Sequence, residues 1–395
     1  MRIRFAIRTL NAACVALGLT ILAVLTVSAV PSAQAQTFKS IYSFTGDPDG
    51  ATPYGSVIIK DNTSTLYGTT TYGGSDNFGT VYKLSKSGKE KVLYSFTGGA
   101  DGGEPFAGLA MDKSGTLYGT TIAGGSSNKG TVFKLNPTTK KETVLYSFTG
   151  GTDGSTPFSG LVMDESGNLY GTTAQGGSSG GGVVYKVNIK TKKETVLHSF
   201  AGNPDGAEPL YGNLLMDKSG NLYGTTVDGG TSNAGTVWKV SAKGKETVLY
   251  SFTGGSDGGG VFEQSLATDG KGNLYGTTEE GGADSVGVVF KVNIKAKSES
   301  VLYSFSGSPD GAYPSSGLVR DSKGNLYGTT QNGGVDNDGA VFELTGEKET
   351  ILHSFDGTDG QNPFTSPLLD EDGTLYGTTY NGGADGRGTV YSVKP

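Results

Sequence analysis

The stretch Leu117-Tyr118-Gly119-Thr120-Thr121 occurs seven times in this sequence of 395 residues. Its copies begin at Leu66, Leu117, Leu169, Leu222, Leu274, Leu326 and Leu375. They stand 49 to 53 residues apart, and two other strings keep the same period: Tyr/His-Ser-Phe, first at Tyr42, and Gly-x-Val-aromatic, first at Gly79. Self-similarity at a fixed period of this length indicates a repeat architecture.

Each repeat predicts four short β-strands. In the second copy they are expected at residues 108–112, 116–121, 130–135 and 142–148. β-branched and aromatic residues fill these runs, and Gly, Asn, Asp and Ser fill the gaps between them. A four-stranded unit of about 50 residues is typical of a β-propeller blade.

The two ends of the repeat array favour a closed ring. The array begins with a lone fourth strand at residues 38–45 and ends after a third strand at residues 388–393. In a ring, the N-terminal strand completes the last blade and no edge strand is left unpaired. A parallel β-solenoid, the alternative, gives no reason for this permutation. We therefore predict an all-β protein: one domain, residues 36–395, folded as a seven-bladed β-propeller with four-stranded blades.

Residues 1–35 have the pattern of a secretory signal peptide. Three Arg residues precede a nearly uninterrupted apolar run, residues 11–30, and Ala33 and Ala35 occupy the small-residue positions of a cleavage site. We expect cleavage before Gln36 and a secreted location, extracellular or periplasmic. The alternative is an uncleaved anchor, since about 20 apolar residues can span a bilayer.

Composition excludes several classes of protein. Glycine accounts for 67 residues and charged residues for only 17%, which disfavours both helical folds and charge-expanded disorder. Removing residues 1–35 removes three Arg and no acid, so the net charge changes from −7 to −10. An acidic chain is a poor nucleic-acid binder, and Cys14, its one cysteine, lies in the leader. We expect no nucleic-acid partner, no membrane contact after cleavage, no disulfide and a monomer.

The repeat also resembles a known family. Asn-Leu-Tyr-Gly-Thr-Thr-x-x-Gly-Gly, as at residues 221–230, followed by Gly-Thr-Val-Phe, as at residues 130–133, is similar to the GloVer tandem repeat of exported bacterial proteins. That "choice-of-anchor" family carries varied C-terminal sorting tails. The resemblance covers nearly all of residues 38–394 and implies export; the end of this chain, residues 390–395, has no such tail, so release from the cell is expected. The family implies no activity for any residue.

A second, shorter resemblance concerns the first hairpin of each blade. Residues 164–170, Asp-Glu-Ser-Gly-Asn-Leu-Tyr, are similar to the first hairpin of NHL and streptogramin-lyase-like propellers. This resemblance implies the fold alone.

Aromatic residues in the glycine-rich loops are the candidate ligand-binding residues. In a propeller, the loops from strand four to the next strand one share a face with the loops between strands two and three. The candidates on these loops are Tyr54, Phe106, Phe158, Tyr211, Phe262, Tyr313, Phe364, Tyr72 and Tyr380. They predict an aromatic surface that binds a glycan, a peptide or a cell-surface partner. The alternative is that they close the channel by packing on one another.

The sequence lacks the residues that most catalytic mechanisms require. His198 and His353, the only histidines, replace Tyr in Tyr-Ser-Phe strings about three repeats apart, and only Arg320 and Arg387 follow the leader. A Ser-His-Asp triad, a histidine metal site and an arginine triad are therefore excluded, and we predict no catalytic residue. A carboxylate-dependent glycan hydrolase or lyase remains an alternative, as does a purely structural surface protein. The acids available to such an enzyme are Glu104, Glu208, Glu263, Glu279 and Glu280.

Two sets of repeated aspartates are interpreted as turn residues. One set precedes Leu-Tyr by five residues, and the other lies in Asp-Gly pairs between repeats. An Asp side chain closes such turns by accepting backbone N–H bonds. The first set is Asp61, Asp112, Asp164, Asp217, Asp269, Asp321 and Asp370, and the second is Asp49, Asp101, Asp153, Asp205, Asp257, Asp310 and Asp359. We predict no metal or cofactor; Ca²⁺ at residues 47–50 or 336–339 is a weaker alternative, because neither loop has full EF-hand spacing.

Overall fold

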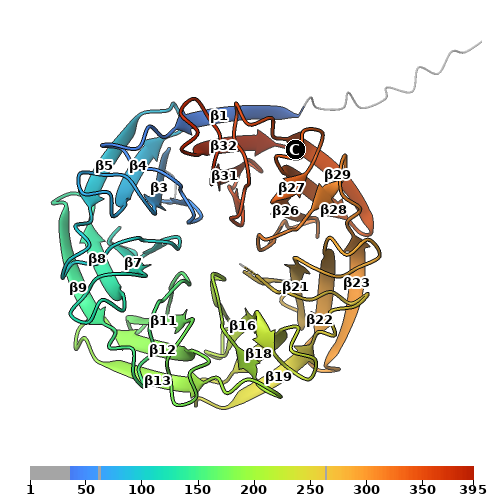
Figure 1. The fold of residues 1–395 in the computed structure, drawn as a ribbon, viewed down its shortest axis with the longest axis horizontal. Coiled ribbons are helices and arrows are strands. Elements are labelled where there is room, and N and C mark those ends of the chain that lie inside the picture. Colours follow the sequence, from blue (N-terminus) through green and yellow to red (C-terminus); the bar gives the residue numbers. More distant parts are fainter. Residues whose placement is uncertain (1–35, 61–63, 263–264) are drawn as a thin grey trace, which may run out of the picture. The chain divides into compact units, whose positions relative to one another are not determined.

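Seven antiparallel four-stranded sheets are arranged around a central axis in the computed structural model, which describes residues 36–60, 64–262 and 265–395 (Figure 1). No helix occurs in these ranges. The prediction of an all-β, seven-bladed propeller is confirmed. The proposed leader, Asp61 and Glu263 lie outside the described residues, so the predictions made for them stay predictions.

The blades follow one another along the chain, each running from an inner to an outer strand. Blade 1 holds β2 (Ile58–Ile59), β3 (Thr65–Thr70), β4 (Thr80–Ser85) and β5 (Glu90–Ser95); blade 2 holds β6 (Ala110–Met111), β7 (Leu117–Thr121), β8 (Thr131–Asn136) and β9 (Lys141–Ser147); blade 3 holds β10 (Val162–Met163), β11 (Asn168–Thr173), β12 (Val183–Asn188) and β13 (Glu194–Ser199); blade 4 holds β15 (Leu215–Met216), β16 (Leu222–Thr226), β18 (Thr236–Val240) and β19 (Glu246–Ser251). Blade 5 holds β20 (Ala267–Thr268), β21 (Asn273–Thr278), β22 (Val288–Asn293) and β23 (Ser298–Ser304); blade 6 holds β25 (Val319–Arg320), β26 (Leu326–Thr330), β28 (Ala340–Thr345) and β29 (Lys348–Ser354); blade 7 holds β30 (Leu368–Leu369), β31 (Leu375–Thr379), β32 (Thr389–Lys394) and β1 (Thr37–Ser43). Two short pairs, β14 (Gly206–Ala207) with β17 (Asp228–Gly229) and β24 (Gly311–Ala312) with β27 (Asn332–Gly333), join loops.

The chain closes where its first strand meets its last. β1 pairs antiparallel with β32, with Thr37 opposite Lys394 and Ser43 opposite Thr389. The N-terminal strand thus becomes the outer strand of blade 7, as the order of repeats predicts. This pairing covers the outer edge of β32 and gives blade 7 four strands like the other blades.

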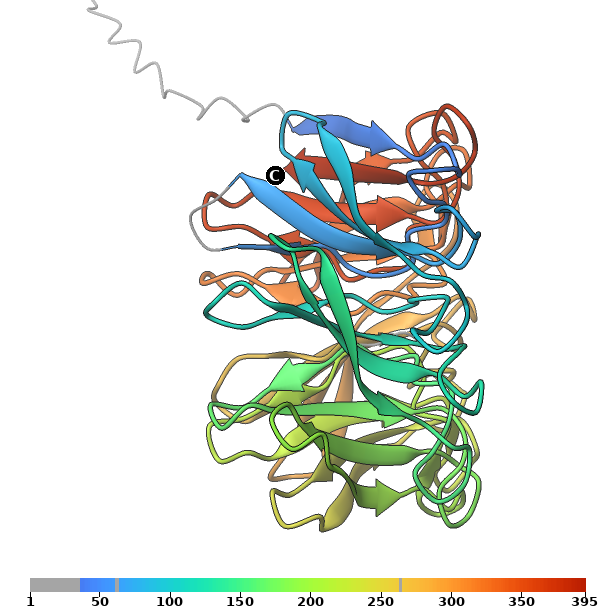
Figure 2. The same cartoon turned by 90° about the vertical axis from the view of Figure 1, so that its left-hand side faces the viewer.

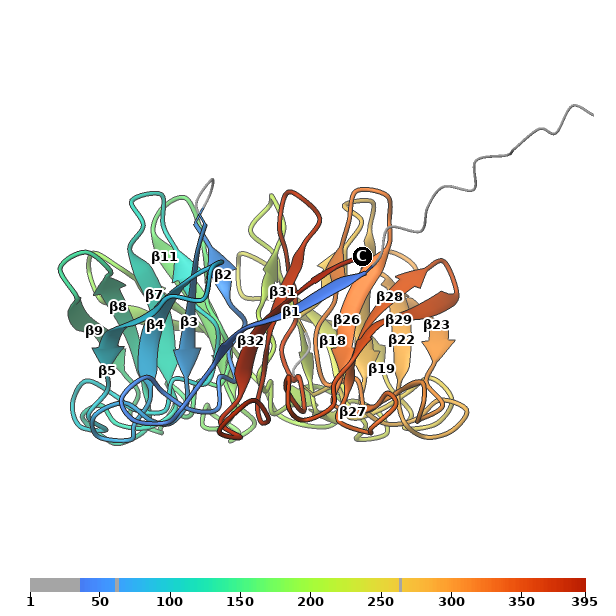
Figure 3. The ribbon, with the colours of Figure 1, turned by 90° about the horizontal axis from the view of Figure 1, so that it is seen from above.

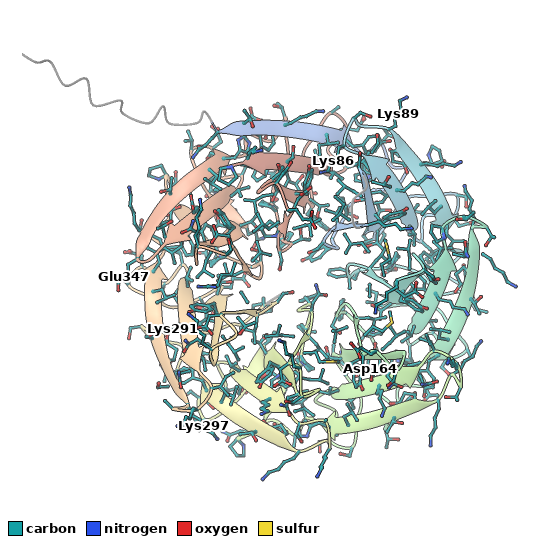
Figure 4. The ribbon with its side chains drawn as sticks, turned by 180° about the vertical axis from the view of Figure 1, so that it is seen from behind. Lys86, Lys89, Asp164, Lys291, Lys297 and Glu347 are labelled. Atoms are coloured by element: carbon teal, nitrogen blue, oxygen red, sulfur yellow. The ribbon has the colours of Figure 1, made fainter. Side chains whose placement is uncertain are left out.

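The two faces of the propeller differ in the loops they carry. Connections from an outer strand to the next inner strand, and those between the second and third strands, lie together on one face, which we call the loop face. The other two kinds of hairpin lie on the opposite, hairpin face (Figures 2 and 3). Figure 1 views the loop face and Figure 4 the hairpin face.

Glycine in the repeated string makes room for an aromatic side chain. In blade 4, Gly224 lies opposite Trp238 on the neighbouring strand. A Cβ on Gly224 would lie 2.5 Å from the Trp238 ring, which is closer than side chains pack. The paired strings Leu-Tyr-Gly-Thr-Thr and Gly-x-Val-aromatic therefore encode one cross-strand contact in each blade.

The two threonines of the same string make different hydrogen bonds. The first donates to a loop of the following blade: Thr69 Oγ1 to the Ala107 carbonyl at 2.9 Å in blade 1, and Thr120 Oγ1 to Ser159 at 3.1 Å in blade 2. The second joins strands within its blade, as Thr70 Oγ1 does with Thr80 Oγ1 at 2.9 Å. These side chains are buried, so each bond satisfies a group that water does not reach.

Apolar contacts between neighbouring blades form the core. At the boundary of blades 1 and 2, for example, Val81 and Phe96 of one blade pack with Leu117 and Phe133 of the next. Similar clusters join the other neighbouring blades among the described residues. No single blade buries both of its faces, so each depends on its neighbours.

Candidate functional site

Aromatic side chains from the loop face gather at the axis. Tyr54 stacks on Phe364 with ring centroids 4.9 Å apart, and lies 3.7 Å from Phe106 in a tilted arrangement. Tyr211 contacts Phe158 edge-to-face at 4.7 Å. With Tyr380, which meets Tyr54 and Phe364 edge-on, these six side chains form what we call the axial aromatic cluster. All six are half-buried.

Little free space lies against the cluster. A cavity of about 30 Å³ lies against the cluster, lined also by small residues such as Gly55, Ser56, Ser265 and Ser366. That volume holds no more than a few water molecules. A ligand at this face would therefore rest on the aromatic cluster rather than enter this cavity. The rings also bury part of their surface against one another.

Beside the cluster lies a shallow depression of about 360 Å³. It is lined by Tyr54, Tyr211, Phe262, Glu279, Glu280, Ser315, Gln331 and Phe364. Blade 6 leaves this space because Ser315 follows Pro314 at the position where Phe106 follows Pro105 and Phe364 follows Pro363. We call this depression the cup.

The charge of the cup is negative. Glu279 and Glu280 come directly after β21, and no Lys or Arg is among the described residues that line the cup. Burial, with a smaller contribution from the neighbouring Glu280 carboxylate, raises the pKa of Glu279 to about 7. Aromatic faces and two carboxyl groups thus share one surface.

The remaining predicted aromatics lie at other places on the loop face. Phe262 lines the cup without belonging to the axial aromatic cluster. Tyr72 and Tyr313 are the most exposed of the nine, at 39% and 38%. Tyr313 precedes its proline, in a backbone conformation with φ of 52°, whereas the clustered aromatics of blades 1, 2, 3 and 7 follow theirs. The structure therefore brings seven of the nine predicted residues to the axis and its cup.

The acids considered for catalysis are not gathered at one point. Glu279 and Glu280 line the cup, whereas Glu104 and Glu208 lie in turns between blades with φ of 55° and 54°. Glu104 lies near Tyr72, whose pKa it helps to raise, after burial of the phenol.

The Asp-Gly aspartates have structural partners that the sequence did not indicate. In every repeat, the Asp carboxylate bonds the Tyr or His of the preceding Tyr/His-Ser-Phe string, at 2.7 to 3.1 Å. The pairs are Tyr42–Asp49, Tyr94–Asp101, Tyr146–Asp153, His198–Asp205, Tyr250–Asp257, Tyr303–Asp310 and His353–Asp359. We call this contact the latch. The latch explains why His can replace Tyr, since the Tyr hydroxyl and the His Nε2–H can each donate to the carboxylate. In the sequence, the signal for this contact is the nearly constant spacing of six or seven residues between the two partners.

The other aspartates close the first hairpin of each blade. Asp112 accepts the backbone N–H groups of Ser114 and Thr116, each at 2.9 Å, and the Tyr118 hydroxyl at 3.0 Å. Asp164, Asp217, Asp269 and Asp321 bond their hairpins in the same way. Asp370 accepts the backbone N–H of Asp372 at 3.0 Å and also pairs with Lys86 of blade 1.

The two loops considered for Ca²⁺ already use carboxylate oxygens. Asp49 accepts from Tyr42 and from Thr45, and Asp338 accepts from the Gln361 amide. Within the described part of the chain, no group of three or more His, Cys, Asp or Glu side chains is placed to hold a metal.

A second series of acids, which sequence reasoning missed, lies between the outer strands. One half-buried Glu stands at or next to the start of each outer strand of blades 1 to 6, and its Oε1 atom is enclosed without a hydrogen-bond partner. Burial, and the latch aspartate of the preceding outer strand, raise the pKa of each to about 7. The six are Glu90, Glu142, Glu194, Glu246, Glu299 and Glu349.

Comparison with known proteins agrees with this architecture. The model of the Gloeobacter/Verrucomicrobia repeat matches residues 26–171, 93–271 and 212–395, which together span almost all of the sequence. The chain belongs to this family. The resemblance predicted from the repeated strings is confirmed, and each matched range spans several blades of the propeller. Among curated proteins, none matches the sequence significantly.

Several solved structures share the fold of this repeat protein. Oligogalacturonate lyase from Vibrio parahaemolyticus aligns with a TM-score of 0.52 and 14% identity over 91% of this chain and 97% of its own. An oligogalacturonate lyase in complex with manganese aligns with 0.54 and 14% over 91% and 96%. The extracellular domain of a one-component system from B. thetaiotaomicron aligns with 0.58 and 12% over 90% of this chain and 40% of that one. At these identities the likeness extends to the fold alone.

The described ranges contain no helix that is long and apolar enough to cross a membrane.

Proposed function

We propose that this propeller is an exported binding protein whose cup holds a carbohydrate that is neutral or carries amines. The observation that supports the proposal is the shared surface of aromatic rings and two carboxyl groups beside the axial aromatic cluster. Aromatic faces stack on the C–H faces of sugars, and carboxylates accept hydrogen bonds from hydroxyl and ammonium groups.

Charge supports this class of ligand over an acidic one. Glu279 and Glu280 would repel a uronate, and no described lining residue offers a cation to offset this. The propellers of similar fold named as oligogalacturonate lyases act on a substrate that is itself acidic. The cup of this chain is suited to the opposite charge.

The arrangement favours binding over turnover. The cup is shallow, and its two acids are consecutive residues rather than a pair facing each other across a cleft. One observation favours a second candidate, a hydrolase: Glu279 has a pKa near 7, which suits a general acid. Release of reducing sugar that is lost in the Glu279→Gln variant, with binding retained, would support that candidate.

The test uses purified residues 36–395 and three trisaccharides in isothermal titration calorimetry. The proposal expects binding of chitosan trisaccharide and of cellotriose, and much weaker binding of trigalacturonate. The Phe262→Ala and Glu280→Gln variants should lose affinity, while Tyr313→Ala, on the same face and outside the cup, should keep it. Preference for trigalacturonate, or equal losses in all three variants, would contradict the proposal.

A further inference from the structure

A large groove opens on the hairpin face between blades 1 and 2. Its volume is about 480 Å³, and four lysines line it: Lys60, Lys83, Lys91 and Lys140. No Asp or Glu is among the described lining residues. Figure 4 views this face and labels Lys86 and Lys89, on the hairpin that joins β4 and β5 of blade 1. In a chain with more acids than bases, this is a concentration of positive charge.

Two of the four lysines depart from the repeat. Lys60 stands between Ile59, which pairs with Leu66, and Asp61, whereas blade 2 has no residue between Met111, which pairs with Leu117, and the hairpin aspartate Asp112. Lys91 follows Glu90 at the start of β5, where the outer strands of blades 2 to 6 carry Thr or Ser. The first departure adds a cation and the second replaces a neutral residue with one, and both lysines line the same groove.

A third departure leaves the groove open. In blade 3, Ile189 packs over Gly167 and joins the core between blades 2 and 3; a Cβ on Gly167 would lie 2.9 Å from its Cδ1. Blade 2 has Pro137 at the position of Ile189, and a Cβ on Gly115 would instead lie 3.0 Å from the Lys60 Nζ atom. The ammonium group of blade 1 thus reaches the place that an apolar side chain fills in the next blade.

The other two lysines, Lys83 and Lys140, lie in the walls of the groove. Lys83, half-buried on β4, lies opposite Tyr67 of β3. Lys140 donates to the Val92 carbonyl at 2.8 Å, which ties the hairpin of blade 2 to β5. Lys140 also offsets part of the rise in the pKa of the half-buried Glu90 carboxyl, which burial raises to about 7. An ammonium group has three donors, so Lys140 retains donors for a second partner.

We propose that this groove is a second binding site, which takes a phosphate or sulfate group, either as a free ion or carried on a sugar. A groove lined by one sign of charge concentrates counter-ions, and lysine binds such oxyanions as a point charge. The site is independent of the cup, since the two lie on opposite faces and attract ligands of opposite charge.

Calorimetric titration at constant ionic strength tests this site with two probes, inorganic phosphate and chondroitin sulfate disaccharide. Wild-type residues 36–395 should bind at least one of them. A Lys83→Gln/Lys91→Thr variant, which restores the repeat residue at position 91, should bind it about tenfold more weakly, because two charge-assisted bonds are lost. The matched control is Lys134→Gln, since Lys134 of blade 2 is the equivalent of Lys83.

The two probes separate the sources of the anion. Binding of both identifies a site for the free ion, and binding of the disaccharide alone identifies a sulfated sugar. Equal affinity in the wild type, the double variant and the control would overturn the proposal, as would no binding of either probe by a folded wild type. Circular dichroism of each variant establishes that it is folded.

Discussion

The ring of Phe38 lies flat on the ring of His353, with centroids 3.5 Å apart and planes 7° apart. Phe38 is in β1, the strand that closes the propeller, and His353 is in the outer strand of blade 6. At the same place in six other strands the repeat carries a half-buried Glu. Stacked rings therefore join blades 6 and 7, at a place where the other blades set a glutamate carboxyl group beside the latch of the preceding blade.

This contact predicts that Phe38 contributes to closure. Phe38→Ala should lower the free energy of unfolding by about 2 kcal/mol, less than a fully buried Phe because Phe38 is only half-buried. Urea unfolding followed by circular dichroism measures the change. Lys39→Ala, an exposed neighbour on the same strand, is the control and should change stability little. Equal effects of the two substitutions would show that the stacking of Phe38 on His353 does not stabilise the packing of β1 on blade 6.

We predict that the glycine of the repeated string is required because a side chain there would collide with the aromatic ring on the facing strand. Gly224→Ala would place a methyl group 2.5 Å from Trp238 and should destabilise the protein by about 1–3 kcal/mol. Gly151→Ala is the matched control, because its Cβ would meet Thr149 Oγ1 at 3.6 Å and Asp153 Oδ1 at 3.9 Å, both ordinary contact distances. Thermal unfolding compares the two variants, and a Gly224→Ala protein as stable as the control would refute the packing argument.

The latch predicts a graded series at one position. Tyr250→Phe removes the hydroxyl that donates to Asp257 at 2.9 Å and should cost about 1 kcal/mol. Tyr250→His should cost less, because His198 and His353 make the same contact in blades 3 and 6. If Tyr250→His proves more damaging than Tyr250→Phe in urea unfolding, then His cannot replace Tyr as the hydrogen-bond partner of Asp257.

Stability is predicted to fall as the pH rises from about 4.5 to about 7. The six outer-strand glutamates have pKa values near 7 when folded, against an ordinary value of 4.5. Between these values the folded protein binds more protons than the unfolded one, so raising the pH favours unfolding. The urea midpoint should therefore be higher at pH 5 than at pH 7.5, and Glu142→Gln should reduce the difference. A midpoint that rises over this range would contradict the assignment.

Much of the fold could be predicted because the repeated strings are themselves pairing signals. Leu-Tyr-Gly-Thr-Thr and Gly-x-Val-aromatic mark adjacent strands, and the early fourth strand, Phe38 to Thr45, indicates closure by β1. Seven copies of one pattern reveal its period even where a single copy would be ambiguous.

The site was less predictable because it depends on departures from the repeat. An extra residue, Leu210, precedes Tyr211, whereas Tyr313 stands before its proline and so lies away from the cluster. The cup exists because Ser315 is small, and a missing side chain leaves no positive signal in a sequence. The sequence also did not indicate that Glu279 is buried, since burial depends on neighbouring blades.

The most direct test of the proposed function fills the cup with the residue that the repeat itself uses. Ser315→Phe introduces at blade 6 the aromatic that follows proline in blades 2, 3 and 7, and Ser316→Ala, beside it and outside the cup lining, is the control. Calorimetric titration with chitosan trisaccharide should show binding by the wild type and the control and none by Ser315→Phe, with all three proteins folded. Undiminished binding by Ser315→Phe would mean that the ligand does not occupy the cup.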